Sequence, residues 1–127
     1  MKTIFFFTKA ESLTITDFDF SGKDDYDLEI RGVKCINCRN ITFTDGHFNK
    51  MHADWGAGVQ LDNELSTEYQ TVDFNNVKFQ NSYGFGGAGL FATGMVKINL
   101  TNCSMEYNSV TRSGESTDAA TAPAGND

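Results

Sequence analysis

One stretch of the sequence gathers side chains that could bind a ligand. The segment TDGHFNKMHADWG, at 44–56, holds both histidines and the only tryptophan of the chain. Two imidazoles with a carboxylate can hold zinc, and an exposed indole can stack on a sugar ring. The spacing between the histidines is not typical of a metal site, so no metal ligand is assigned. We expect instead a loop that contacts carbohydrate or a partner protein through His47, His52, Asp54 and Trp55.

Acidic side chains raise a second hypothesis, the cleavage of polysaccharides. A lyase would need carboxylates that hold calcium beside a basic residue, and a hydrolase would need two carboxylates at a defined separation. The run Asp24-Asp25-Tyr26-Asp27 and the pair Asp19 and Asp73 are available, but that pair falls at different positions of the chain's repeat. The sequence therefore assigns no catalytic residue and no cofactor, and calcium is the cation that an enzyme of this kind would use. A carbohydrate-active lyase or hydrolase, or a fragment of one, is the alternative to a non-enzymatic protein.

The cysteines indicate packing rather than chemistry. Cys35-x-x-Cys38 could serve redox or zinc chemistry, but the chain has three cysteines and no second pair of this kind. We interpret Cys38 and Cys103 as small apolar side chains inside the core, and Cys35 as preceding a strand.

The elements that position these residues follow from a repeat. Four eight-residue units, at 13–20, 36–43, 72–79 and 98–105, are apolar at positions 1, 3, 6 and 8 and polar at positions 2, 4 and 7. Alternation of period two on both sides of a one-residue break predicts strand, tight turn, strand. The break is always Asp or Asn, which tolerate a left-handed backbone. The predicted turn ladder consists of Asp17, Asn40, Asn76 and Asn102.

A second ladder lies between these units, in the tripeptides at 28–30 (Leu-Glu-Ile), 59–61 (Val-Gln-Leu) and 90–92 (Leu-Phe-Ala). Gly-Ala-Gly precedes two of them, at 56–58 and 87–89. Three strand segments in each repeat are typical of a solenoid, in which stacked coils bury a continuous core. An antiparallel sandwich would explain the alternation but not the fixed Asn or Asp. The predicted fold class is all-β, a right-handed parallel β-helix of about four coils.

The repeat also divides the chain. We expect an N-terminal strand or cap at 1–12, β-helix coils at 13–110, and a flexible low-complexity tail at 111–127, where TRSGESTDAATAPAGND has no apolar periodicity. The anchors are 23, 36 and 26 residues apart, which predicts surface insertions in the second coil, at 44–56 and 62–70. No cap is evident after the last coil, so the ends are expected to stack on further coils, on a partner or on copies of the chain.

Three N-glycosylation sequons begin at Asn40, Asn99 and Asn102. In the register of the repeat, Asn40 and Asn102 belong to turns, whereas Asn99 points outward. Asn99 is therefore the candidate glycosylation site if the protein is secreted.

The repeats resemble those of the pectin-lyase-like superfamily of parallel β-helices. NVKFQNSYGFGGAGL, at 76–90, is similar to the short repeats of chlamydial-type polymorphic outer-membrane proteins and related adhesins, which pair an F-x-x-N element with G-G-A-I. The resemblance covers residues 13–110. It implies a secreted or surface-exposed protein with a structural or adhesive role.

Composition is compatible with that role. The chain has 127 residues, a formal net charge of -7 and no basic stripe, which argues against nucleic acid and against an anionic membrane surface. No stretch is long and apolar enough to insert in a membrane as a helix. The sequence thus predicts a non-enzymatic structural or adhesive β-helix module, located extracellularly or at the cell surface. Its expected partners are carbohydrate, further coils, or copies of itself that stack into a fibre.

Overall fold

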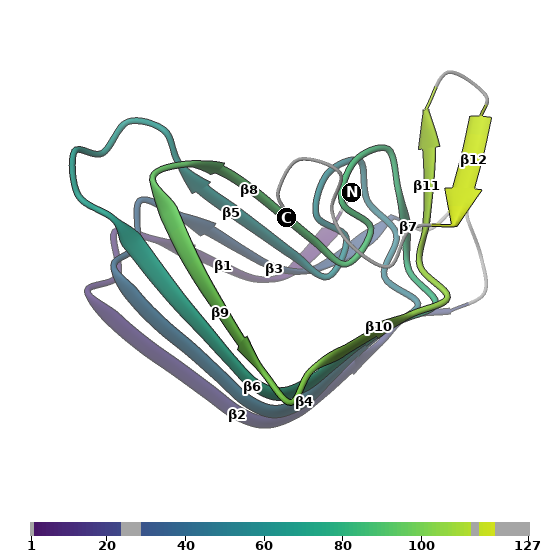
Figure 1. Cartoon of the computed structure of the whole chain (residues 1–127), viewed down its shortest axis with the longest axis horizontal. Coiled ribbons are helices and arrows are strands. Elements are labelled where there is room, and N and C mark those ends of the chain that lie inside the picture. The colour runs from purple at the N-terminus through teal and green to yellow at the C-terminus, as the bar shows by residue number, and fades with distance from the viewer. Residues whose placement is uncertain (1, 24–28, 113–114, 119–127) are drawn as a thin grey trace.

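The computed structural model describes residues 2–23, 29–112 and 115–118, and the regular structure of this part of the chain consists of strands alone (Figure 1). Apolar and polar residues alternate along the longest of them, as expected for strands that bury one face. The strands are β1 Lys2–Thr8, β2 Ser12–Ser21, β3 Ile30–Ile36, β4 Asn40–Asn49, β5 Val59–Asn63, β6 Gln70–Gln80, β7 Tyr83–Gly84, β8 Leu90–Gly94, β9 Val96–Thr101, β10 Ser104–Glu106, β11 Ser109–Arg112 and β12 Glu115–Asp118.

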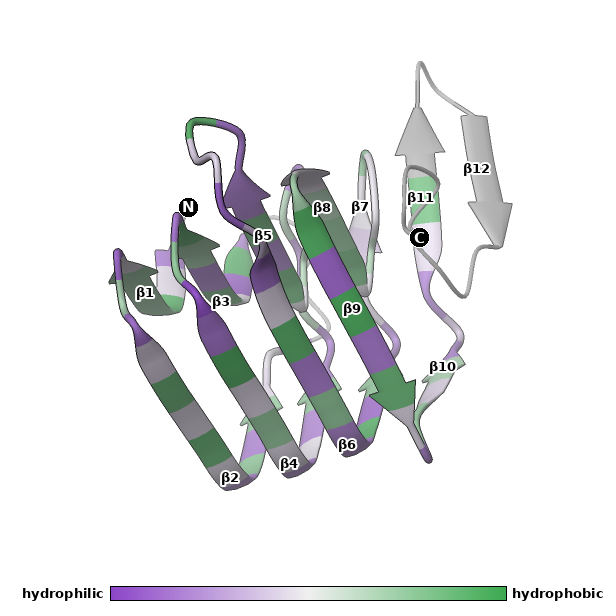
Figure 2. Cartoon of the chain, turned by 60° about the vertical axis from the view of Figure 1, so that its left-hand side comes forward, coloured by the Kyte–Doolittle hydropathy of each residue, from purple (hydrophilic) through white to green (hydrophobic). Residues whose placement is uncertain are grey.

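In the two larger sheets, strands of successive coils pair in parallel. One sheet has the order β1-β3-β5-β8, and a second has the order β2-β4-β6, continued by β9 and β10 on the two halves of β6. A smaller third sheet contains β7, β11 and β12, and its β11–β12 pair is antiparallel. Figure 2 shows the coils side by side along one axis. The protein is a parallel β-solenoid of about four coils, which confirms the predicted fold class.

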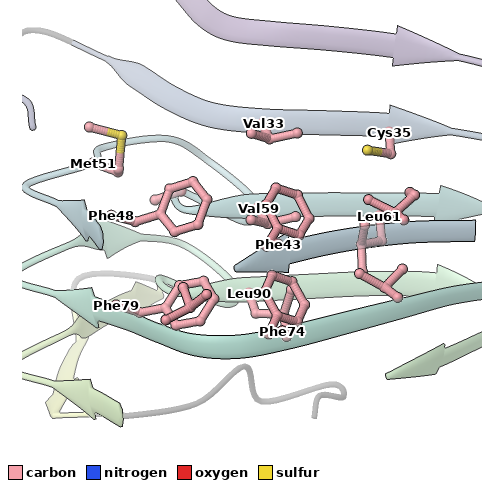
Figure 3. Close-up of a cluster of buried hydrophobic side chains, with 14 of the residues drawn as sticks. Val33, Cys35, Phe43, Phe48, Met51, Val59, Leu61, Phe74, Phe79 and Leu90 are labelled. Carbon is pink, nitrogen blue, oxygen red and sulfur yellow. The ribbon is translucent and has the colours of Figure 1, made fainter. Parts of the chain in front are cut away.

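Inward side chains of successive coils form columns that fill the solenoid. The rings of Phe43 and Phe74 stack with centroids 4.8 Å apart, and those of Phe48 and Phe79 are 5.2 Å apart (Figure 3). All four rings are fully buried. Burying such a side chain contributes about 2–3 kcal/mol, so these columns are the main stabilising element of the fold.

Single residues with a left-handed backbone make the corners of each coil. At the bend of the second sheet, φ is 51° at Asp17, 55° at Asp45, 56° at Asn76 and 54° at Asn102. Three further corners also stack residues of positive φ. They are Lys50, Asn81 and Tyr107; Gly56 and Gly87; and Lys9 and Asn37. Lys and Tyr seldom adopt a left-handed backbone, so the sequence pattern reveals only the corners made by Asp, Asn and Gly.

The predicted position of Asn40 in the turn ladder is wrong. Asn40 begins β4 and is paired with Thr71, whereas Asp45 follows Asp17 in the column. The second repeat unit therefore lies at 41–48, five residues later than predicted. The cause is Gly46, which stands where the pattern requires an apolar residue. A side chain on Gly46 would overlap the ring of Phe18, which fills that space from the neighbouring coil.

The first member of the second ladder is also misplaced. The structure pairs Val59 with Leu90 and Leu61 with Ala92, as that ladder requires. The preceding coil supplies Val33 and Cys35, not the tripeptide at 28–30, of which Leu28 lies outside the described residues. Cys35 consequently lies inside the core, within β3, rather than before a strand.

The corrected register changes the predicted division of the chain. β1 is the first strand of the sheet that continues with β3, so residues 2–8 belong to a coil. The corner residues at 17, 45, 76 and 102 are spaced 28, 31 and 26 apart, and segment 44–56 is part of the regular coil rather than an insertion. At the other end, residues 109–112 and 115–118 form β11 and β12, and the rest of the expected tail lies outside the described residues.

Candidate functional site

The predicted binding loop does not form, because β4 carries His47 on its outward side. His47 Nε2 lies 2.7 Å from the side-chain oxygen of Gln80, and its Nδ1 lies 3.8 Å from a carboxylate oxygen of Asp19. These neighbours come from β6 and β2, so His47 belongs to a polar row that crosses three coils.

His52 and Trp55 lie elsewhere, on the third side of the coil. The His52 side chain is buried and meets the ring of Tyr83 edge-on. Trp55 is 42% exposed, covers Gly86 and contacts Phe91 at 5.2 Å between ring centroids. The carbonyl oxygen of Asp54 accepts hydrogen bonds from the backbone of the next coil. The sequence grouped these residues because they are close along the chain, but the corner at Lys50 turns the chain onto another side of the coil after β4.

Within the described residues, no three His, Cys, Asp or Glu side chains gather into a group that could hold a metal ion. Asp19 and Asp73 lie in different outward columns, opposite His47 and Asn99 respectively. The run 24–27 lies outside the described residues.

Cys35 and Cys38 are buried neighbours with free thiols. A hydrogen bond from the Cys35 thiol lowers the pKa of Cys38, and the same bond raises the pKa of Cys35. The Cys38 sulfur also lies 3.7 Å from the carbonyl oxygen of Phe7 and 3.6 Å from that of Ile36. Both thiols are fully covered, which agrees with a packing role.

The exposed corner of the second sheet is held by a chain of side-chain hydrogen bonds. The Asn102 amide donates to the side-chain oxygen of Asn76 at 3.3 Å, and the Asn76 amide donates to Asp45 at 2.8 Å. These contacts run along the solenoid axis, as stacked amides do in other parallel assemblies. The corner therefore ties neighbouring coils together and keeps the outward face of the sheet regular.

Replacing Asn76 with alanine is expected to lower the free energy of unfolding by about 1–2 kcal/mol, because alanine is strained at positive φ and both hydrogen bonds disappear. Urea denaturation followed by circular dichroism measures this loss. Asn76→Gly is the matched control, since glycine accepts the backbone conformation and removes only the side chain. A glycine variant less stable than the alanine variant would contradict the role given to the left-handed corner.

The face beside this corner has an unusual composition. The outward positions of β2, β4, β6 and β9 before the corner make three columns of four residues. They are Ser12, Asn40, Thr71 and Lys97; Thr14, Thr42, Asp73 and Asn99; and Thr16, Thr44, Asn75 and Thr101. We call these twelve residues the hydroxyl face, since seven carry a hydroxyl and three an amide. All twelve are exposed or half-buried.

The hydroxyl face is a regular grid of hydrogen-bonding groups. Adjacent coils of a parallel sheet lie about 4.8 Å apart, and alternate residues of a strand about 6.6 Å apart. Hydroxyl and amide groups both donate and accept hydrogen bonds. The Asn99 amide already donates to Asp73 at 2.7 Å within the grid. The predicted repeat marks Thr14, Thr16, Asp73, Asn75, Asn99 and Thr101 as polar, but only the corrected register of β4 brings Thr42 and Thr44 into line with them.

One end of the hydroxyl face is braced by Arg39. Its guanidinium donates to Glu68 at 3.1 Å, to Ser66 at 2.9 Å and to the side chain of Asn63 at 3.3 Å. These contacts hold the segment between β5 and β6 against the start of β4. The guanidinium therefore holds this loop in place.

The chain matches no protein-family model, no curated protein and no solved structure. Among the residues described, none lies in a helix capable of spanning a membrane. The fold and the site together define a parallel β-solenoid with a regular polar face and a corner held by stacked side chains.

Proposed function

We propose that this chain is a non-enzymatic structural or adhesive β-solenoid module of a cell-surface or extracellular assembly. The hydroxyl face is the observation that supports this function. Its grid of donors and acceptors is suited to a ligand that repeats on a similar scale, such as the hydroxyl groups of a polysaccharide. Each hydrogen bond contributes only about 1 kcal/mol, so binding would depend on many weak contacts made at once.

Flatness and rigidity favour such binding. Asn76 and Asn102 link the coils along one margin of the face, and Arg39 braces the other end. A surface already held in its binding geometry loses little conformational entropy when it meets a repetitive ligand. The polysaccharide surface is therefore the proposed partner, and Trp55 provides a second, separate aromatic contact point for sugar.

The resemblance to pectin-lyase-like repeats and to outer-membrane adhesin repeats supports the same proposal. Proteins with such repeats are secreted or surface-exposed, and many are adhesive. Asn99, an exposed member of the hydroxyl face, remains the predicted glycosylation site. A glycan there would cover part of the grid, so it would reduce adhesion rather than assist it.

The competing hypothesis is a carbohydrate-active lyase or hydrolase. Such an enzyme needs carboxylates that converge on one sugar unit. Asp17 and Asp45 are neighbours at the corner of the second sheet, whereas its other acidic side chains lie on the two sides of the corner, Asp73 before it and Asp19 and Glu106 after it. Their dispersion favours the adhesive role, and release of sugars from an acidic polysaccharide in the presence of calcium would overturn it.

Replacing Thr42 and Thr44 with valine is expected to weaken binding to insoluble β-linked polysaccharides by about tenfold, since two hydrogen-bonding groups are lost from the centre of the grid. Valine keeps the branched shape that suits a strand. A sedimentation assay with the full chain and a panel of insoluble polysaccharides measures the change.

The matched control is the pair Thr8→Val and Thr93→Val, which removes two hydroxyls from the outer side of the other parallel sheet. This control should bind as the unaltered chain does. Equal loss in both variants, or no binding by the unaltered chain, would contradict the proposed role of the hydroxyl face.

A further inference from the structure

The first and last coils leave core-facing side chains open. Phe5 in β1 is 42% exposed and Leu100 in β9 is 48% exposed, whereas Val33 and Phe74, which lie beside them in their columns, are fully buried. Among the described strands, β1 and β2 pair on one side only, as do β8 and β9. Each end thus presents apolar side chains together with unpaired backbone donors and acceptors, a combination that promotes association.

We propose that two copies of this chain stack head to tail, with the β8–β9–β10 end of one copy against the β1–β2 end of the next. The columns of the solenoid then continue across the junction in the same register. In the second sheet, Ile98 then meets position 13 of the next copy, and Leu100 meets position 15. This is the register in which neighbouring coils pair inside the molecule.

Side-chain sizes match across this junction. The ring of Phe18 needs space on its neighbour, which inside the molecule is provided by Gly46. At the other end, the same column finishes with the small side chain of Cys103. In the first sheet, Phe7 would meet the column that ends in Ala92. At these two positions a large residue at one end therefore faces a small one at the other, which suits close packing.

Charge favours this arrangement over a symmetric head-to-head one. Head-to-tail stacking places Ser104 opposite Asp19, Glu106 opposite Ser21 and Lys97 opposite Ser12 of the next copy. No two like charges meet along this strand pair. A symmetric head-to-head junction would instead gather Asp17 and Asp19 from both copies on one pair of strands, and like charges in direct opposition are destabilising.

Sedimentation velocity over a range of concentrations tests the proposal with the full chain. The unaltered protein is expected to show a mass that rises with concentration beyond a dimer, because head-to-tail stacking is open-ended. Leu100→Lys and Ile15→Lys each place a charge at one end and should weaken association by at least about tenfold. Leu65→Lys, at a side chain that is 90% exposed on the β5–β6 segment, is the control and should associate normally.

A mixture of the Leu100→Lys and Ile15→Lys variants gives the decisive result. Each keeps one intact end, so the mixture should form dimers and nothing larger, while each variant alone stays monomeric. Dimers formed by either variant alone would show a symmetric junction and overturn the proposal. A monomeric unaltered chain at all concentrations would overturn it as well, and neither result depends on what the hydroxyl face binds.

Discussion

A Gly46→Ala variant is expected to lose about 3 kcal/mol of unfolding free energy, a large effect for the addition of one methyl group. A Cβ on Gly46 would overlap the ring of Phe18, and that ring also packs against Phe43 and Phe48 at 6.0 and 5.0 Å between centroids. Overpacking of a filled core typically costs about 1–3 kcal/mol, and here the upper end applies because the displaced ring cannot move without disturbing two others. Urea denaturation followed by circular dichroism measures the loss.

Gly89→Ala is the matched control for this substitution. The nearest side-chain atom to a Cβ at Gly89 belongs to Phe79 and lies at 3.4 Å, an ordinary contact, and the backbone there is not left-handed. This variant is expected to change stability by less than about 1 kcal/mol. Equal losses at Gly46 and Gly89 would show that the ring of Phe18 does not occupy the space assigned to it.

A Phe74→Ala variant is expected to lose about 4 kcal/mol, the cost of removing a large aromatic side chain from a closed core. Phe74 is fully buried, stacks on Phe43 at an interplanar angle of 5°, and meets Phe79 edge-on at 5.5 Å. The cavity would lie in the third of four coils, with an intact coil on each side. A solenoid depends on contacts between neighbouring coils, so this single change is expected to separate the chain into two weakly coupled halves.

Thermal and urea unfolding of Phe74→Ala should therefore show a lower midpoint and a shallower transition. Phe85→Ala removes the same side chain at a position that is 46% exposed, and should cost less than about 1 kcal/mol. A Phe74→Ala variant that unfolds as steeply and at the same midpoint as the unaltered chain would contradict the assignment of this column to the core.

Much of the fold could be predicted from the sequence, because a solenoid repeats its local rules in every coil. Alternation of period two around Asp17, Asn76 and Asn102 is visible in the chain, and the structure places these residues in one column. The prediction was wrong where one coil departs from the rule. Gly46 leaves an inward position without a side chain, and a search for apolar residues at fixed positions cannot recognise that Phe18 fills it from the coil before.

The candidate site depended even more on the tertiary structure. His47, His52 and Trp55 looked like one loop because they are close in sequence, yet the corner after β4 leaves His47 on one side of the coil and His52 and Trp55 on another. The hydroxyl face is the reverse case, because the fold brings together residues that are far apart in the sequence. Its members are spread from position 12 to position 101, and a shift of five residues in one strand is enough to hide the grid.

By itself, the sequence determined that the chain forms strands with a left-handed break and that stacked coils share one core. The physical reason is local, since the alternation of apolar residues and the backbone tolerance of Asp and Asn act within a few residues. Only the tertiary structure decided the register of the second coil, the corners made by Lys50 and Tyr107, and the alignment of the outward hydroxyls. These features arise between coils, where the space left by one residue is filled by another about thirty positions away.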